Sequence, residues 1–373
     1  MTEDARDSSV APEPPATRPQ LKATVGVAHL EGGQAAGFVI EKARDIDVHS
    51  TVNVLGMNRE QMEAFADLIT ARLGLKDLAL KELVRQPVSE AAREAIAQAI
   101  AAEKQIAAEG QTVSAKTLYS LGRMALHARN WDEALAYFRQ ATEADPELSD
   151  AFEDIAWLQQ SRAMVDYQQQ DYDAAMAKLK EAYQAGLHTD PFDPRALALT
   201  GFVSKSLAQV AAALGDRDEE QRHLLQAARY FEQATLRDPG DLSAQHGLGN
   251  VQHHLGHLDE AIAAYEKVVA ARPDHAFAQH DLALAYEQKI KTDPDQASLW
   301  CERALQAWCV AYALFQEGRG PTAETDRLVA LAQIRKLEAQ CGEPGAKQAC
   351  RNCQAELPPD ARFCPNCGVP VGA

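Results

Sequence analysis

The sequence predicts a mainly helical protein in which helix pairs stack into an array, with a small N-terminal α+β segment and a short C-terminal metal-binding segment. Aromatic residues make up only 6% of the 373 residues and alanine is abundant, which favours close-packed helices over sheets. Landmark residues recur at a fixed interval in the middle of the chain, and two Cys-x-x-Cys pairs lie near its end. The length exceeds one ordinary domain of roughly 100 to 200 residues, so several folding units are expected.

Residues 1–57 are predicted to form a tail and a small β segment. Residues 1–20 are acidic and rich in proline and alanine, without a basic start and apolar stretch, so we expect a disordered tail and no secretion signal. Residues 21–57 include the clearest strand, Asp45–Val54, where apolar residues alternate with a period of two. So small a sheet is marginal alone, and a second copy of the chain is one way to complete it, which would make a homo-oligomer.

Residues 58–110 are predicted to be helical, with a role that the sequence does not identify. Asn58 and Gln61 have the spacing of a capping box at a helix start, and a second helix is expected over Ser89–Glu109. Gly32, Gly33 and Gly37 upstream fit a turn better than a phosphate loop, because their spacing departs from Gly-x-Gly-x-x-Gly.

The array is predicted over residues 114–340. Ala227 and Ala261, Phe231 and Tyr265, and Pro239 and Pro273 are each 34 residues apart, and an earlier copy carries Leu121-Gly122, Ala134 and Phe138. Small residues let two helices approach, the aromatic ring one turn later fills the space between pairs, and proline ends the second helix. Extra residues relative to this interval are expected around 185–194, and a last helix over residues 322–340 is expected to cover the apolar end.

This pattern resembles the tetratricopeptide repeat. The resemblance implies an α-solenoid whose first helices line a groove for an extended peptide or a partner helix, and hence a non-catalytic interaction scaffold or adaptor. The lysine and arginine pattern with which some members hold a terminal carboxylate is not evident. By the same resemblance, the residues expected to face the groove are Tyr119, Arg123, His246, Asn250, His253, His280 and Leu284.

Histidines concentrate in this region, since six of the eleven lie between His246 and His280. His253 and His257 have the helical spacing of a metal pair, but His257 is expected at a turn and no further ligand is evident. Polar groove residues are therefore the preferred interpretation, and we expect His246 and His280 to be neighbours because they lie 34 residues apart.

The C-terminal residues 350–373 carry the most specific chemical signal. Cys350, Cys353, Cys364 and Cys367 form two Cys-x-x-Cys pairs separated by ten residues, which suits tetrahedral zinc. The segment resembles short prokaryotic zinc ribbons, and four sulfur ligands imply a structural ion without an open position for catalysis. A redox-active pair is the alternative, disfavoured because no thioredoxin-like context surrounds it. Residues 341–349 are expected to be a linker that lets the ribbon move.

Charge and cysteine usage restrict partners and location. A formal net charge of -17 disfavours nucleic acid and anionic membranes, and the most apolar stretch, Ala304–Phe315, is too short to span a bilayer. We expect Cys301, Cys309 and Cys341 to be thiols in a reducing cytoplasm, in a bacterial protein.

Two other functions remain open at this stage. One is a regulatory subunit or an enzyme with activity in residues 22–110, where His29 and His49 are the only evident acid-base candidates. The other is a transcription regulator that uses the zinc ribbon, which predicts nucleic-acid binding that weakens steeply with salt.

Overall fold

The structure is a computed structural model that describes residues 57–75, 78–317, 323–341, 348–349, 353, 355–357 and 363–369. The expected tail and nearly all of the expected β segment, residues 1–56, lie outside the described residues. The first described elements are α1 (Arg59–Arg72), α2 (Leu80–Leu83) and α3 (Glu90–Ala108). Asn58 and Gln61 form the expected capping box at the start of α1.

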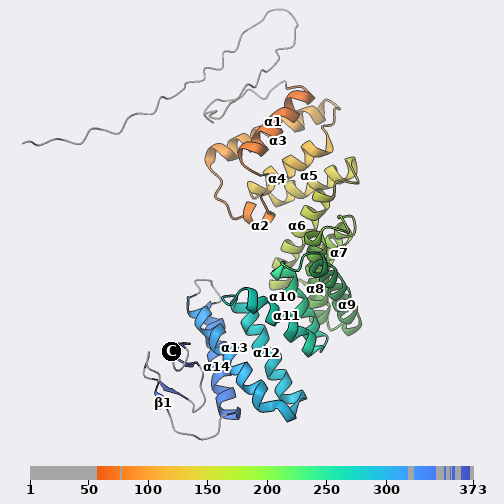
Figure 1. Ribbon diagram of the computed structural model, residues 1–373. Coiled ribbons are helices and arrows are strands. Elements are labelled where there is room, and N and C mark those ends of the chain that lie inside the picture. Colours follow the sequence, from red (N-terminus) through yellow and green to blue (C-terminus); the bar gives the residue numbers. More distant parts are fainter. Residues whose placement is uncertain are drawn as a thin grey trace, which may run out of the picture. The chain divides into compact units, whose positions relative to one another are not determined.

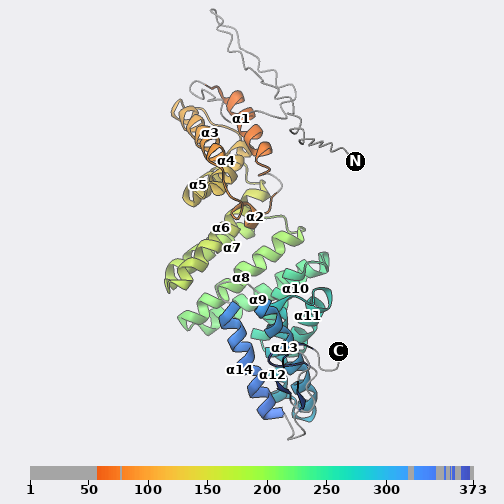
Figure 2. The ribbon, with the colours of Figure 1, turned by 90° about the vertical axis from the view of Figure 1, so that its left-hand side faces the viewer.

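The middle of the chain consists of consecutive helix pairs (Figures 1 and 2). The prediction of a mainly helical repeat array is therefore confirmed. Helix α14 packs on α13 after the last pair, and a single 3-10 turn, Pro294–Gln296, precedes α13. The pairs are α4 (Ala115–His127) with α5 (Trp131–Ala144), α6 (Ser149–Gln168) with α7 (Tyr172–Gly186), α8 (Pro194–Leu214) with α9 (Arg217–Arg237), α10 (Leu242–His254) with α11 (Leu258–Ala271), and α12 (Ala276–Thr292) with α13 (Ala297–Glu317); α14 spans Ala323–Cys341.

The turns inside four of these pairs share one design. A residue with positive φ lies one or two positions after the first helix, and the next residue is the N-cap of the second helix: Arg129 (φ 65°), Gln170 (φ 65°), Gly215 (φ 79°) and Gly256 (φ 81°) occupy the first position. Asn130, Asp171 and Asp216 follow three of them, and each side chain accepts a hydrogen bond from a backbone N–H of the helix that it starts. The sequence thus reverses the chain within two or three residues.

The core of the array pairs small residues with aromatic rings, as the repeat pattern predicted. A Cβ atom at Gly122 would lie 2.4 Å from the Phe138 ring, and one at Gly249 would lie 2.6 Å from the Tyr265 ring. The Phe231 ring would meet a Cβ at Gly201 (2.9 Å) and at Gly247 (2.6 Å), so α8 and α10 flank the same ring. A larger residue at any of these glycines would wedge the helices apart.

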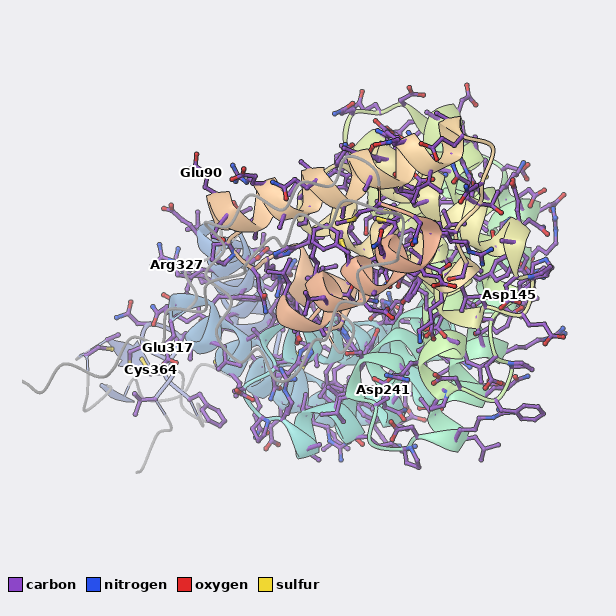
Figure 3. All side chains as sticks on the ribbon, turned by 90° about the horizontal axis from the view of Figure 1, so that it is seen from above. Glu90, Asp145, Asp241, Glu317, Arg327 and Cys364 are labelled. Carbon is purple, nitrogen blue, oxygen red and sulfur yellow. A yellow bond between two sulfur atoms is a disulfide. The ribbon has the colours of Figure 1, made fainter. Side chains whose placement is uncertain are left out.

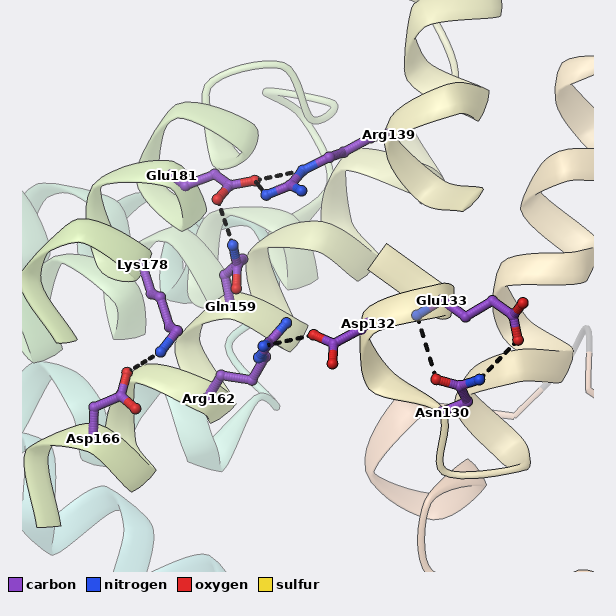
Figure 4. A network of polar contacts seen from close by, with 9 residues as sticks. All are labelled: Asn130, Asp132, Glu133, Arg139, Gln159, Arg162, Asp166, Lys178 and Glu181. Carbon is purple, nitrogen blue, oxygen red and sulfur yellow. Dashed lines mark hydrogen bonds and ion pairs between the residues drawn. The ribbon is translucent and has the colours of Figure 1, made fainter. Parts of the chain in front are cut away.

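Ion pairs bridge neighbouring helices on the outside of the array (Figure 4). Arg139 on α5 reaches Glu181 on α7 at 2.6 Å, and Arg162 on α6 reaches Asp132 on α5 at 2.8 Å. Each pair has at least one largely exposed partner and the other is partly exposed, so each pair adds at most about 1 kcal/mol to stability. Figure 3 shows further charged side chains, including Glu90 and Glu317, which are exposed at the surface.

Helix α8 corrects the expectation about the most apolar stretch. By length and composition alone, α8 is the one helix among the described residues that could cross a membrane, whereas the sequence analysis selected Ala304–Phe315. However, 61% of its apolar window is buried inside the protein. A core helix of a helical array has this property, because its apolar residues face neighbouring helices on several sides.

The expectation that all cysteines outside the ribbon are thiols is wrong for one pair. Cys301 at the start of α13 and Cys341 at the end of α14 form a disulfide, with 6.0 Å between their Cα atoms. The two helices run side by side in opposite directions, which brings these ends together although the residues are 40 positions apart. Cys309, in the middle of α13, is a buried free thiol.

Candidate partner-binding face and metal centre

The residues predicted to face a groove lie at equivalent positions of the first helices. On each helix they lie three before, one after or four after the packing glycine, spacings that place them on one face. We call this the first-helix face. Its described members are Tyr119 and Arg123 on α4, Phe202 and Lys205 on α8, His246, Asn250 and His253 on α10, and His280 and Leu284 on α12, where Ala283 takes the place of the glycine.

On α10 and α12 the face is organised around Asp281. His246 donates from Nε2 to Oδ2 of Asp281 at 2.8 Å, and His280 donates from Nδ1 to Oδ1 at 2.9 Å. Although burial opposes ionisation, these hydrogen bonds lower the pKa of Asp281 to about 2. The carboxylate therefore stays charged and joins the two histidines that the sequence analysis expected to be neighbours.

Asp281 itself was not predicted. Its only signal in the sequence is its position directly after His280, which does not reveal that His246 lies on its other side. The rings around it restrict the two histidines: His246 lies 5.1 Å from the His275 ring, and His280 lies 4.9 Å from the Trp308 ring.

Two polar groups on this face have no hydrogen-bond partner among the described residues. The buried Nε2 atom of His253 has none, and burial, together with His254, lowers the pKa of His253. The ammonium of Lys205 lies 5.7 Å from the Phe202 ring, without a carboxylate in ion-pair distance among the described residues. Burial lowers the pKa of Lys205, and Asp281 partly offsets this. Asn250 differs, because it accepts a hydrogen bond from the Tyr265 hydroxyl at 2.7 Å.

On α4 the same face is covered by the chain itself, so the assignment of Arg123 to an open groove is wrong. Arg123 is only 5% exposed. It donates from Nε to the Leu75 carbonyl at 2.8 Å and from Nη2 to the Leu78 carbonyl. His127, one turn further, donates from Nδ1 to the Leu83 carbonyl at 3.2 Å. Leu75 and Leu83 are fully buried, and we call Leu75 and residues 78–83 the covering segment.

A buried ion pair anchors the covering segment. Arg123 Nη1 lies 3.2 Å from Asp154 Oδ2 on α6 and also donates to the Tyr119 hydroxyl at 3.0 Å. Tyr119 is thereby part of this internal network, and its ring packs 5.8 Å from Phe138. Burial raises the pKa of Asp154, and Arg123 only partly offsets that effect. Nearby on α6, burial and the carboxylates of Asp193, Asp150 and Asp154 raise the pKa of Glu153 to about 7.

Three of the four predicted metal ligands converge. The Sγ atoms of Cys353, Cys364 and Cys367 all lie within 4.8 Å of one another, and no other such group of metal-ligating side chains occurs among the described residues. Cys350 lies outside the described residues. Strands β1 (Gln348–Ala349) and β2 (Glu356–Leu357) pair in antiparallel fashion, and Cys353 lies in the connection between them.

The donor set suits zinc. Hydrogen bonds from Asn366 and from the Ala355 backbone lower the pKa of Cys353 to about 6, which favours the thiolate that a metal requires. The second knuckle is closed by two backbone hydrogen bonds, from Gly368 N to Cys364 O at 2.7 Å and from Cys364 N to Val369 O at 2.8 Å. Cysteine sulfur atoms at this spacing are typical zinc ligands.

The ribbon contacts α13. The expectation that residues 341–349 form a linker that lets it move stays a prediction, because residues 342–347 lie outside the described residues. Tyr312 donates from its hydroxyl to the Asn366 carbonyl at 3.4 Å. Phe363 packs against the buried cluster formed by α11, α12, α13 and α14, and a Cβ atom at Gly368 would lie 2.4 Å from the Ala313 Cβ. Both ends of the expected linker also belong to regular elements, since Cys341 ends α14 and residues 348–349 form β1.

Comparisons with known proteins agree with this architecture. Residues 115–148, 212–276 and 254–308 match tetratricopeptide repeat families, and residues 350–371 match a zinc-ribbon domain. The chain therefore carries tetratricopeptide repeats and a C-terminal zinc ribbon. A search of the curated proteins gives no match.

Several solved structures are similar at low identity. YrrB, described as a TPR protein with an unusual peptide-binding site, is 19% identical with a TM-score of 0.40, over 65% of this chain and 99% of that chain. MamA is 20% identical with a TM-score of 0.35, over 50% and 94%. The thermophilic TPR protein TTC0263 from Thermus thermophilus is 19% identical with a TM-score of 0.38, over 59% and 100%.

Proposed function

We propose that the protein is a non-catalytic interaction scaffold that binds a segment of another protein on the first-helix face of α8, α10 and α12. The observation that carries this proposal is the contrast between α4 and the later helices. On α4 the face already holds a polypeptide, the covering segment, through hydrogen bonds to its carbonyl groups. On α8 and α10 the same positions present Lys205 and His253, which have no hydrogen-bond or ion-pair partner among the described residues.

The chemistry of the face favours a peptide with carbonyl or carboxylate acceptors. A partly dehydrated lysine without an ion pair is unfavourable, and a bound acceptor would relieve that cost. Asp281 is occupied by His246 and His280 and so is not available as the missing acceptor at hydrogen-bond distance. The net charge of -17 further supports proteins over nucleic acids as partners.

The test compares partner recovery by the full chain and by the double variant Lys205→Ala/His253→Ala. Neither side chain makes a hydrogen bond within the described residues, so the fold is expected to persist. Lys267→Ala, an exposed lysine on α11, is the matched control. Affinity purification from the native host, quantified by mass spectrometry, should show proteins that the control retains and the double variant loses. Equal recovery by all three proteins would refute the proposed face.

We further propose that the ribbon's zinc is structural and that the protein is cytoplasmic. Thiolate ligands need reduced cysteines, which supports a reducing compartment. The Cys301–Cys341 disulfide is the kind of bond that oxidising compartments favour, so the location needs a direct test. Trapping thiols in intact cells, followed by mass spectrometry, would show whether Cys301 and Cys341 are bonded there.

A homo-oligomer formed through residues 21–57 also remains a proposal. Light scattering of the full chain and of a chain that lacks residues 1–56 would test it. Equal subunit numbers would count against a role of the N-terminal segment in assembly.

A further inference from the structure

The contact between the ribbon and α13 uses residues of the metal knuckle itself. Gly368 follows the ligand Cys367 directly, and its φ of +69° is a conformation that favours glycine. Its Cα lies so close to α13 that an added Cβ would be 2.4 Å from Ala313 Cβ and 3.4 Å from the Cys309 carbonyl. The carbonyl of Asn366, between the two ligands of this knuckle, accepts from Tyr312. The residues of the ribbon that contact α13 therefore belong to the same loop as the cysteines Cys364 and Cys367.

The backbone geometry of such a knuckle depends on its metal. A segment this short cannot build a sufficient core, and small zinc modules of this kind are folded with metal and unfolded without it. The close approach of Gly368 to Ala313 requires the particular path of residues 364–369, which two backbone hydrogen bonds and the three sulfur atoms define. Metal binding to these cysteines would therefore stabilise the same backbone path that the contact with α13 uses.

We propose that the zinc ribbon docks on α13 of its own chain and that this docking depends on the metal. The ribbon docks on Cys309, Tyr312 and Ala313, which we call the α13 docking site, and zinc binding and docking are thermodynamically coupled. The ribbon itself occupies the α13 docking site in the structure. The contact is specific because only glycine fits at position 368. Coupling is reciprocal: if zinc promotes docking, then docking raises zinc affinity by the same factor. Loss of zinc would expose the α13 docking site.

Helix α14 is not expected to follow the ribbon. The Cys301–Cys341 disulfide holds the end of α14 on α13 independently of the metal. Chelation should therefore release residues 348–369 while leaving α13 and α14 packed. This surface of α13 is apart from the first-helix face of α8 and α10, and its contact with the ribbon does not depend on whether that face binds a partner.

The experiment uses the full-length protein and changes α13 without altering the ribbon. Ala313→Glu places a longer, charged side chain where Gly368 sits, and Gln306→Glu, at an exposed position of α13, is the matched control. Zinc affinity is measured by competition with a chelating dye. We expect Ala313→Glu to weaken zinc binding roughly five-fold or more, the lower end of typical coupling, and Gln306→Glu to leave it unchanged.

Hydrogen exchange at saturating zinc gives a second readout. Amides of residues 363–369 should exchange faster in Ala313→Glu than in the control, and those of α14 should not change. Helical circular dichroism verifies that α13 stays folded; should Ala313→Glu disturb it, Ala313→Leu repeats the test with an apolar side chain. Zinc affinity and exchange rates equal to those of the control would overturn the proposal.

Discussion

Replacing Arg123 with alanine tests whether the covering segment is anchored by a buried ion pair. The change leaves the Asp154 carboxylate buried without its counter-charge and the carbonyls of Leu75 and Leu78 without their donor. Removing one member of a buried pair typically costs about 3–5 kcal/mol, and each orphaned carbonyl adds to that loss. We therefore expect Arg123→Ala to lower the free energy of unfolding by at least about 3 kcal/mol. This is a large part of the total stability of an ordinary domain, about 5–15 kcal/mol.

The assay is urea unfolding followed by helical circular dichroism, with Arg139→Ala as the control. Arg139 makes an equally direct ion pair with Glu181, but its side chain is 50% exposed, so its loss should stay below about 1 kcal/mol. Hydrogen exchange should locate the Arg123 effect in the covering segment, which contains α2, and in α1 and α3 on either side of it.

The effect should also depend on pH with a definite sign. Burial already raises the pKa of Asp154, and the loss of Arg123 raises it further. As pH falls, the Asp154 carboxylate is therefore protonated more readily in the folded variant than in the unfolded chain. The penalty should therefore be smaller at pH 5 than at pH 8. A loss below about 1 kcal/mol at pH 8, no larger than that of Arg139→Ala, would refute the reasoning. Combining Arg123→Met with Asp154→Leu should restore much of the stability, because no unpaired charge remains.

Three further predictions follow from packing, titration and the disulfide. Gly249→Val should destabilise the protein by about 1–3 kcal/mol in urea unfolding, because its Cβ would lie 2.6 Å from the Tyr265 ring; an unchanged midpoint would contradict that contact. Burial and nearby carboxylates raise the pKa of Glu153 to about 7, so its contribution to stability is present at acidic pH and is lost as pH rises towards 7; Glu153→Gln should flatten this part of a stability-pH curve. Reduction of Cys301–Cys341, which closes a loop of 40 residues, should lower stability by up to about 4 kcal/mol, and Cys301→Ser should remove any effect of reductant on the unfolding midpoint.

The repeat array was predictable because its contacts are local and periodic. Gly122 meets Phe138 within a single helix pair, and Gly249 meets Tyr265 in the same way. The period of 34 residues reflects this packing, and it also predicts that His246 and His280 are neighbours. In the structure Asp281 joins the two histidines.

The covering segment was not predictable in this way. Arg123 and the carbonyl of Leu75 are 48 residues apart, and a backbone carbonyl leaves no trace in the choice of side chain. A groove position and a buried anchor therefore look the same in the sequence, since both place a polar residue on the first-helix face.

The disulfide and the ribbon contact escaped prediction for related reasons. Cys301 and Cys341 have no spacing that distinguishes a bonded pair from two thiols, and only the antiparallel packing of α13 and α14 brings them together. For the ribbon, the four-cysteine pattern specified the metal chemistry. It did not specify that the glycine after the last cysteine would rest on Ala313.

The covering segment also restricts how a protein of this kind can lengthen in evolution. Tandem duplication is the simplest route to a longer array, but a new unit placed before α4 would have to displace leucines that are fully buried and carbonyls that are already bonded. A unit inserted between α9 and α10 would meet no such obstacle and would extend the surface next to Lys205 and His253. Homologues of different length should therefore differ in the number of interior units and share the same first one.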